Sequence, residues 1–98
     1  MQLKVGIKTY EIQKPSEIIQ VGGEFAGMQS YRRSTIEIAD KLDQQDKNQV
    51  FWHEILHAIC DRFHLRELDG DEQTIDLLAT GIYEVIQDNP DIFQMENI

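Results

Sequence analysis

The sequence predicts an α+β fold, in which a small antiparallel or mixed sheet of about three strands packs on two main helices. Apolar residues alternate with polar ones in the first forty positions, a period that is typical of strands. In two later segments they recur every three or four positions, which indicates amphipathic helices. A chain of 98 residues rarely builds two separate cores. We therefore expect one domain over residues 1–98, with residues 1–43 mainly in the sheet.

Three strands are expected in the N-terminal part of the chain. Residues 3–12 alternate in polarity and include β-branched side chains, which favours a strand. Prolines and glycines interrupt the pattern at residues 14–16 and 22–23, and the residues between these breaks are too few to assign. The second strand is expected over residues 24–30 and the third over 34–39, with a turn at 31–33.

Two helices are expected in the second half of the chain. Asp46 and Gln49 fit a capping box, so the first helix is expected over residues 46–64. The second is expected over residues 70–89, and residues 91–98 form a tail after Pro90. At about 100° per residue, each helix has one apolar arc that predicts its core-facing side. The arcs consist of Trp52, Ile55, Leu56, Ile59 and Phe63 in the first helix, and of Ile75, Leu78, Ile82, Val85 and Ile86 in the second.

Composition and charge exclude several classes of partner. The net charge is −9, and residues 66–98 carry one Arg against nine Asp and Glu residues. This balance argues against duplex nucleic acid, because phosphate binding needs a basic surface. No apolar run approaches the roughly 20 residues that a membrane span needs, and residues 1–10 do not look like a signal peptide. Cys60 has no second cysteine to pair with, so we expect a cytoplasmic protein with no membrane partner.

The segment His53 to His57 carries the pattern H-E-x-x-H within the first helix. Side chains four residues apart lie on the same helix face, so two imidazole nitrogens can converge on one cation at about 2.0–2.1 Å. Glu54 points about 100° away and could reach a water beside the cation. The alternative is a chance match in which the histidines only pack, but the acid between the pair favours a metal site.

A catalytic zinc ion usually has three protein ligands, so a third ligand is needed. His64 would lie about 10 Å beyond the second histidine along a continuous helix, too far for the same ion. Cys60 is also poorly placed, and a lone cysteine is more often a small buried apolar residue. The sequence therefore favours Glu72 at the start of the second helix, over the weaker candidates Glu24 and Glu37.

Asp76 follows Glu72 by one helical turn. It could accept the outer N–H of a ligating histidine and so fix the tautomer of that ring. The alternative for Glu72 is structural, because residues 69–72 also fit a capping box in which Glu72 turns back to the helix start.

With these motifs, the sequence resembles the gluzincin metallopeptidases. Residues 51–59 and 72–79 carry the likeness, and the size and element order resemble the minimal members, namely the minigluzincins and the phage-type or ImmA/IrrE-like peptidases. The resemblance covers mainly residues 24–88. It implies that His53, His57 and Glu72 bind one Zn²⁺, that Glu54 is the general base and acid, and that Asp76 supports a ligand. It also implies an edge strand above the metal that pairs with an extended peptide. This chain is very short and shows no helix-turn-helix, so a repressor-cleaving role is not carried over.

We therefore expect a zinc-dependent metallopeptidase whose peptide or protein substrate binds as an added strand, since residues 34–39 lead into the metal helix. An oxyanion donor could come from Tyr10 or Tyr31, whereas Tyr83 lies too far along its helix. The tail could cover the core edge, or lie in the cleft and keep the enzyme latent. The alternative function is a non-catalytic metal-binding module whose acidic C-terminal third binds a basic protein.

Overall fold

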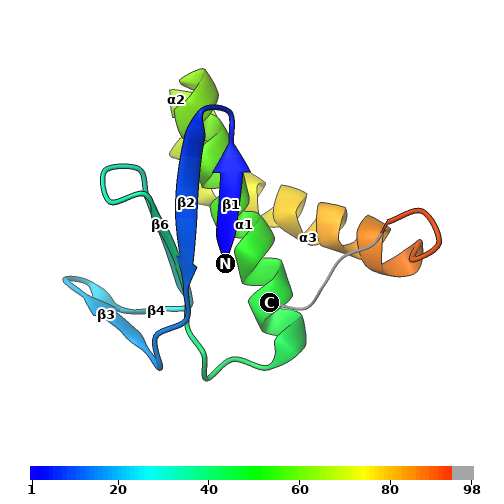
Figure 1. Cartoon of the computed structure of the whole chain (residues 1–98), viewed down its shortest axis with the longest axis horizontal. Helices are drawn as coiled ribbons and strands as arrows, with labels where there is room; N and C mark the ends of the chain where they lie inside the picture. Colours follow the sequence, from blue (N-terminus) through cyan, green and yellow to red (C-terminus); the bar gives the residue numbers. More distant parts are fainter. Residues whose placement is uncertain (94–98) are drawn as a thin grey trace.

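The computed structural model describes residues 1–93, and this part of the chain forms six strands and three helices (Figure 1). The α+β class expected from the sequence is confirmed. The helices are α1 (Gln44–Phe63), α2 (Arg66–Asp69) and α3 (Glu72–Asp88). The strands are β1 (Gln2–Val5), β2 (Lys8–Gln13), β3 (Ile18–Gln20), β4 (Gly23–Phe25), β5 (Gly27–Ser30) and β6 (Thr35–Ile38).

The main sheet is mixed and has four strands in the order β1-β2-β6-β5. Strands β1 and β2 are antiparallel neighbours, β2 and β6 are parallel, and β5 is antiparallel to β6. In the last pair Gly27 lies opposite Ile38, and Ser30 lies opposite Thr35. Strand β5 therefore forms one edge of the sheet, and its outer side has no neighbouring strand among the described residues.

The expected first strand is in fact a hairpin. The chain reverses between β1 and β2 at Gly6, whose φ of 64° is readily adopted only by a residue without a Cβ atom. Ile7 continues the apolar alternation, yet its side chain is 91% exposed at the turn. The pattern therefore spans two strands, because a two-residue reversal does not interrupt the alternation of apolar residues.

A second, two-stranded sheet follows. Strands β3 and β4 pair antiparallel, and Figure 1 shows this hairpin projecting away from the main sheet. The unassigned stretch before Gly22 is thus a strand, and the break at residues 22–23 is its turn. The strand expected over residues 24–30 is divided by a bend at Ala26, so that its first part belongs to this hairpin and its second part is β5.

Helix α1 begins two residues earlier than expected. Its N-cap is Asp43, whose side chain accepts a hydrogen bond from the Asp46 backbone N–H at 2.8 Å. The helix ends at Phe63, and its C-cap residue His64 adopts a left-handed conformation with φ of 59°. The short helix α2 follows, and the sequence pattern did not predict it.

Asp71 caps helix α3. Its carboxylate accepts hydrogen bonds from the Thr74 backbone N–H at 3.1 Å and from the Thr74 hydroxyl at 2.7 Å. The capping role considered for Glu72 is therefore wrong, because the preceding residue occupies the N-cap.

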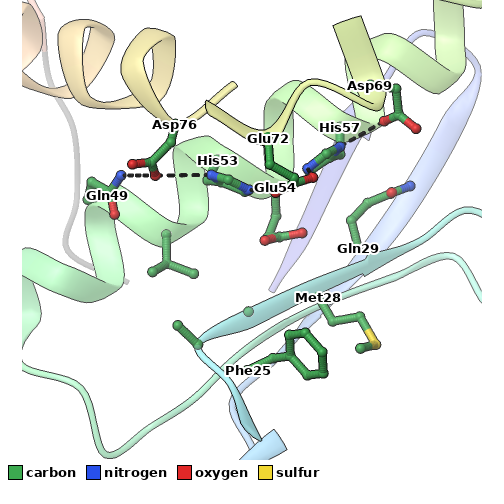
Figure 2. A pocket seen from close by; sticks show the side chains of 13 residues that line it. Phe25, Met28, Gln29, Gln49, His53, Glu54, His57, Asp69, Glu72 and Asp76 are labelled. Carbon is green, nitrogen blue, oxygen red and sulfur yellow. Dashed lines mark hydrogen bonds and ion pairs between the residues drawn. The ribbon is translucent and has the colours of Figure 1, made fainter. Parts of the chain in front are cut away.

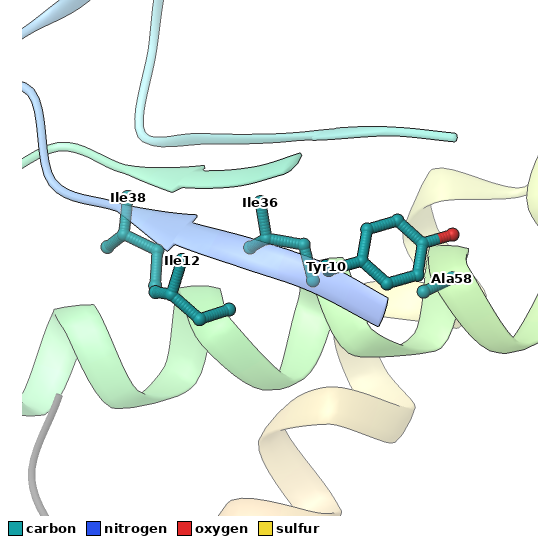
Figure 3. Packing of buried hydrophobic residues seen from close by; sticks show 5 residues of the cluster. All are labelled: Tyr10, Ile12, Ile36, Ile38 and Ala58. Atoms are coloured by element: carbon teal, nitrogen blue, oxygen red, sulfur yellow. The ribbon is translucent and has the colours of Figure 1, made fainter. Parts of the chain in front are cut away.

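The core lies between the main sheet and α1 (Figure 3). Strands β2 and β6 turn large apolar side chains toward the helix, and burial of each such side chain stabilises the fold by about 1.5–3 kcal/mol. On its other side α1 packs against α3. The buried cluster consists of Tyr10, Ile12, Ile36, Ile38 and Ala58.

The expected apolar arcs are correct only in part. Ile75 is fully buried, but Phe63 is 61% exposed and Val85 is 53% exposed. Helix α3 instead packs on α1 through Ala79 and Tyr83, both buried, so the packed face is rotated relative to the arc. The arc identifies apolar residues, but which of them meet a neighbour depends on the tertiary packing. No helix within residues 1–93 is long and apolar enough to span a membrane.

Candidate metal centre

Helices α1 and α3 bring two imidazoles and one carboxylate together. His53 Nε2 lies 3.0 Å from one oxygen of Glu72, and His57 Nε2 lies 2.8 Å from the other. The two rings lie side by side one turn apart on α1, with centroids separated by 5.0 Å. One candidate ligand atom from each of the three residues lies within 4.8 Å of the others. This is the group that the sequence predicted (Figure 2).

Each histidine also has a carboxylate at its other ring nitrogen. Asp76 Oδ1 lies 3.3 Å from His53 Nδ1, as the one-turn spacing from Glu72 suggested. Asp69 Oδ1 lies 2.7 Å from His57 Nδ1, a contact that the sequence reading missed. A carboxylate that accepts the Nδ1–H leaves Nε2 as the nitrogen with a free lone pair, so both Nε2 atoms are prepared to bind a cation.

Gln49 on α1 contacts two side chains of α3, Asp76 and Thr80. Its side-chain amide donates to Asp76 Oδ1 at 3.0 Å and lies 3.2 Å from the Thr80 hydroxyl. The side chains of α1 and α3 that face the site are thus cross-linked by hydrogen bonds beside His53 (Figure 2).

Glu54 is the buried carboxyl group of the site, with only 7% of its surface exposed. Burial raises the pKa of Glu54 to about 7, because the charged form loses its hydration. The neighbouring imidazoles and a hydrogen bond from the Gln29 backbone lower this pKa, and the charge of Glu72 raises it, but burial outweighs the lowering contributions. Near neutral pH the group can therefore both accept and release a proton.

The imidazole of His57 is a second group of the site with a shifted pKa. Burial lowers the pKa of this imidazole, whereas the hydrogen bond with Asp69 and the charges of Glu72 and Glu54 raise it. The net pKa lies above the ordinary value of 6.5. A proton on the His57 imidazole would therefore compete with a cation for its Nε2 atom.

A cavity of about 650 Å³ contains the site and is bounded below by β5 (Figure 2). Phe25 and Met28 line its lower side, opposite the histidines. Gly27 allows the strand to approach α1 here, because a Cβ atom at this position would collide with Val50 and would lie 3.2 Å from Glu54 Cγ. The edge strand and Glu54 are therefore direct neighbours.

The other candidate ligands lie outside the group. Cys60 is buried, His64 ends α1, Glu24 pairs with Lys41, and Glu37 lies within β6. The two tyrosines considered as oxyanion donors do not line the cavity. Tyr10 accepts a hydrogen bond from Gln29 at 3.2 Å, Tyr31 lies beneath the Lys8 ammonium, and Tyr83 is buried beside Asn48.

The donor set is compatible with one metal ion. Two imidazole nitrogens and a carboxylate oxygen are common ligands of divalent transition metals, and the outer carboxylates fix the ring tautomers that such binding needs. No protein-family model matches the chain, and no curated protein or solved structure is significantly similar to it. The interpretation of the site therefore rests on its own geometry.

Proposed function

We propose that the protein is a zinc-dependent metallopeptidase that hydrolyses peptide bonds in extended segments of peptides or proteins. The observation that carries this proposal is the position of Glu54. A buried carboxyl group with a pKa of about 7 lies beside a His53, His57 and Glu72 group that could hold a metal ion. A metal site that serves only for storage or for stability does not need a buried carboxyl group that exchanges a proton near neutral pH.

Zinc is the metal that suits these ligands best. Two histidines and one glutamate form a ligand set of catalytic zinc sites, whereas structural zinc sites take four ligands that often include several cysteines. The described residues bring three such ligands together, and Cys60 lies outside the group. When bound, zinc would supply Lewis acidity and lower the pKa of water toward 7.

The residues of the chain would then divide the proton transfers among them. A carboxylate oxygen of Glu54 takes a proton from the attacking water and delivers it to the nitrogen of the leaving amine. Asp76 and Asp69 fix the orientation of the His53 and His57 rings, which would hold a bound cation beside Glu54.

The edge strand β5 gives the substrate a place to bind. The sequence reading connected residues 34–39 with this role, but β6 is an internal strand with neighbours on both sides. Strand β5 borders the cavity, and its outer edge has no neighbouring strand within residues 1–93, so an extended peptide can add to it by backbone hydrogen bonds. Such pairing requires little side-chain specificity, which suits a chain of this size.

The proposal is tested by metal content and proteolysis in matched variants. Wild type, Glu54→Gln and Glu17→Gln are purified, loaded with zinc and incubated with fluorescein-labelled denatured casein. We expect one zinc per chain in all three, and cleavage by the wild type and by Glu17→Gln but not by Glu54→Gln. Glu17 is an exposed residue outside the cavity, so its variant controls for the loss of one charge.

Two results would contradict the proposal. Equal cleavage by wild type and Glu54→Gln would assign the activity to a contaminant or another site. Zinc retention without cleavage by any of the three proteins would favour the alternative function, a non-catalytic metal-binding module with a basic protein partner.

A further inference from the structure

A second cavity lies on the face of α3 that is turned away from the metal centre. It is an apolar groove of about 620 Å³ between α3 and α1, and it shares no lining residue with the site. At about 100° per residue, Leu78 points about 160° away from Asp76 around α3. The groove is lined chiefly by Trp52, Leu77, Leu78, Ile82, Val85 and Phe93.

Several of the apolar side chains that line the groove are exposed. Leu77 is 66% exposed and Leu78 is 44% exposed, and Val85 continues the surface about two turns further along α3. Exposed apolar residues are common singly, but a continuous apolar surface usually marks a site of interaction. This surface takes up part of the apolar arc that the sequence pattern had placed in the core.

Carboxylates border the groove on its solvent side. Glu84 and Asp88 point within about 20° of Leu77 around α3, and Asp91 adjoins the groove residue Phe93 along the chain. All three acids are exposed. No Lys or Arg follows Arg66 in the sequence, so no basic side chain from α3 neutralises this border.

We propose that this groove binds an amphipathic helix of a basic protein partner. The apolar stripe of the partner helix would lie along α3 over Trp52, and its Lys and Arg residues would face Glu84 and Asp88. The exposed stretch of α3 from Leu77 to Ile86 is about 14 Å long, which a partner helix of about three turns would cover. The charge of the border decides the class of partner, because acidic or neutral helices would gain nothing from it.

Charge also disfavours the other possible occupants. A second copy of the chain would bring a second acidic border against the first, and each copy has a net charge of −9. Residues 94–98, which lie outside the described part, contain Glu96 and no basic residue. Neither occupant complements Glu84 and Asp88.

Trp52 provides the measurement, because it lines the groove and is the only tryptophan of the chain. The full-length protein is titrated with a 14-residue helical peptide that has leucines on one face and lysines on the other. We expect a saturable shift of the Trp52 emission to shorter wavelength, and no saturable shift with the counterpart peptide in which glutamates replace the lysines. An equal response to both peptides, or none to either, would overturn the proposal.

Variants separate the two components of the surface. We expect Leu77→Lys/Val85→Lys and Glu84→Lys/Asp88→Lys each to weaken peptide binding at least tenfold. Ile7→Lys/Ile19→Lys makes the same change at exposed apolar residues outside the groove and should keep the wild-type affinity. Circular dichroism verifies that each variant is folded, and unchanged affinity in the two groove variants would contradict the proposal.

Two further measurements test the rival occupants. A dimer in sedimentation analysis of the free protein that Leu77→Lys/Val85→Lys converts to a monomer would assign the groove to a second copy. A chain ending at Phe93 that binds the leucine–lysine peptide at least tenfold more tightly than the full chain would assign it to residues 94–98. We expect a monomer and equal affinities.

Discussion

Asp69 Oδ1 lies 2.7 Å from Nδ1 of His57, the second histidine of the H-E-x-x-H segment. The first histidine has the corresponding contact with Asp76, but that contact is longer, at 3.3 Å. Both rings are therefore oriented by a carboxylate, one from α2 and one from α3, and the aspartate of the short helix makes the closer contact. Helix α2, which the sequence did not predict, places Asp69 beside His57.

Asp69→Asn should weaken metal binding by the protein. An asparagine can still approach Nδ1 but no longer carries the charge that strengthens the hydrogen bond, and loss of such outer contacts typically costs 10–100-fold in metal affinity. The measurement is competition for zinc against a chromophoric chelator. Glu67→Gln removes one charge from the same helix without contacting a histidine and should leave the affinity unchanged; an equal loss in both variants would indicate a general charge effect.

Asp76→Asn should have a smaller effect than Asp69→Asn. Its contact with His53 is longer, and the Asp76 carboxylate is shared with the Gln49 amide. The same competition assay ranks the two variants, with Glu17→Gln as the control. A larger loss from Asp76→Asn would mean that the two contacts differ in the metal-bound protein from those described above.

Glu54 should make the metal-free protein less stable as the pH rises. Its folded pKa of about 7 lies above its ordinary value of 4.5, so the folded state binds more protons than the unfolded state between these values. Between pH 5 and 6.5 this linkage lowers the free energy of unfolding by on the order of 2 kcal/mol. Urea denaturation in the presence of a chelator measures it at several pH values.

Glu54→Gln should remove this dependence, and Glu17→Gln should keep it. The raised pKa of His57 acts in the same direction, but mainly above its ordinary value of 6.5, so the window from pH 5 to 6.5 reports chiefly on Glu54. The lowered pKa values of Asp40 and Asp71 act below pH 4 with the opposite sign. An unchanged pH dependence in Glu54→Gln would contradict the assignment of the raised pKa to this residue.

Gly27→Ala should destabilise the protein and displace the edge strand. The added methyl group would collide with Val50 and crowd Glu54, and such overpacking typically costs about 1–3 kcal/mol. Thermal unfolding of the single and double variants checks the cause: Val50→Ala should recover part of the loss in the Gly27→Ala background. Additive effects of the two substitutions would show that the steric contact is not responsible.

The parts of the site that are encoded by local spacing could be predicted from the sequence. His53 and His57 are one turn apart in any α-helix, so their shared face follows from the period alone. The convergence of Glu72 on the same point depends on how α3 crosses α1, and the sequence could indicate it only through the need for a third ligand. The roles of these residues in catalysis stay predictions.

The role of Asp69 was not predicted from the sequence, because a carboxylate was considered at the Nδ1 atom of one histidine and not at that of the other. Each of the two imidazoles has a second nitrogen, so an outer carboxylate is to be expected beside His57 as well as beside His53. An acid three residues before Glu72 is the signal that was available. The four-residue helix that positions it is too short to produce a recognisable period.

The strand errors have a similar physical origin. The alternation of apolar and polar residues indicates which side of a strand faces the core, but it does not indicate where the chain reverses. The turn at Gly6 could therefore not be predicted from it. Likewise, the apolar arc of α3 mixes residues buried against α1, such as Ile75, with residues of the groove, such as Val85. Sequence periodicity marks both as apolar, and only the packing of the helices separates them.

The Glu72 side chain is 66% exposed, while the buried cluster around Ile36 lies on the opposite side of α1. The carboxylate that completes the ligand group can thus swing into solvent without disturbing the sheet-to-helix packing. Uptake or release of an ion at this group would therefore require movement of one exposed side chain and no change in the core. We therefore expect a chelator to remove an ion bound there without unfolding the protein.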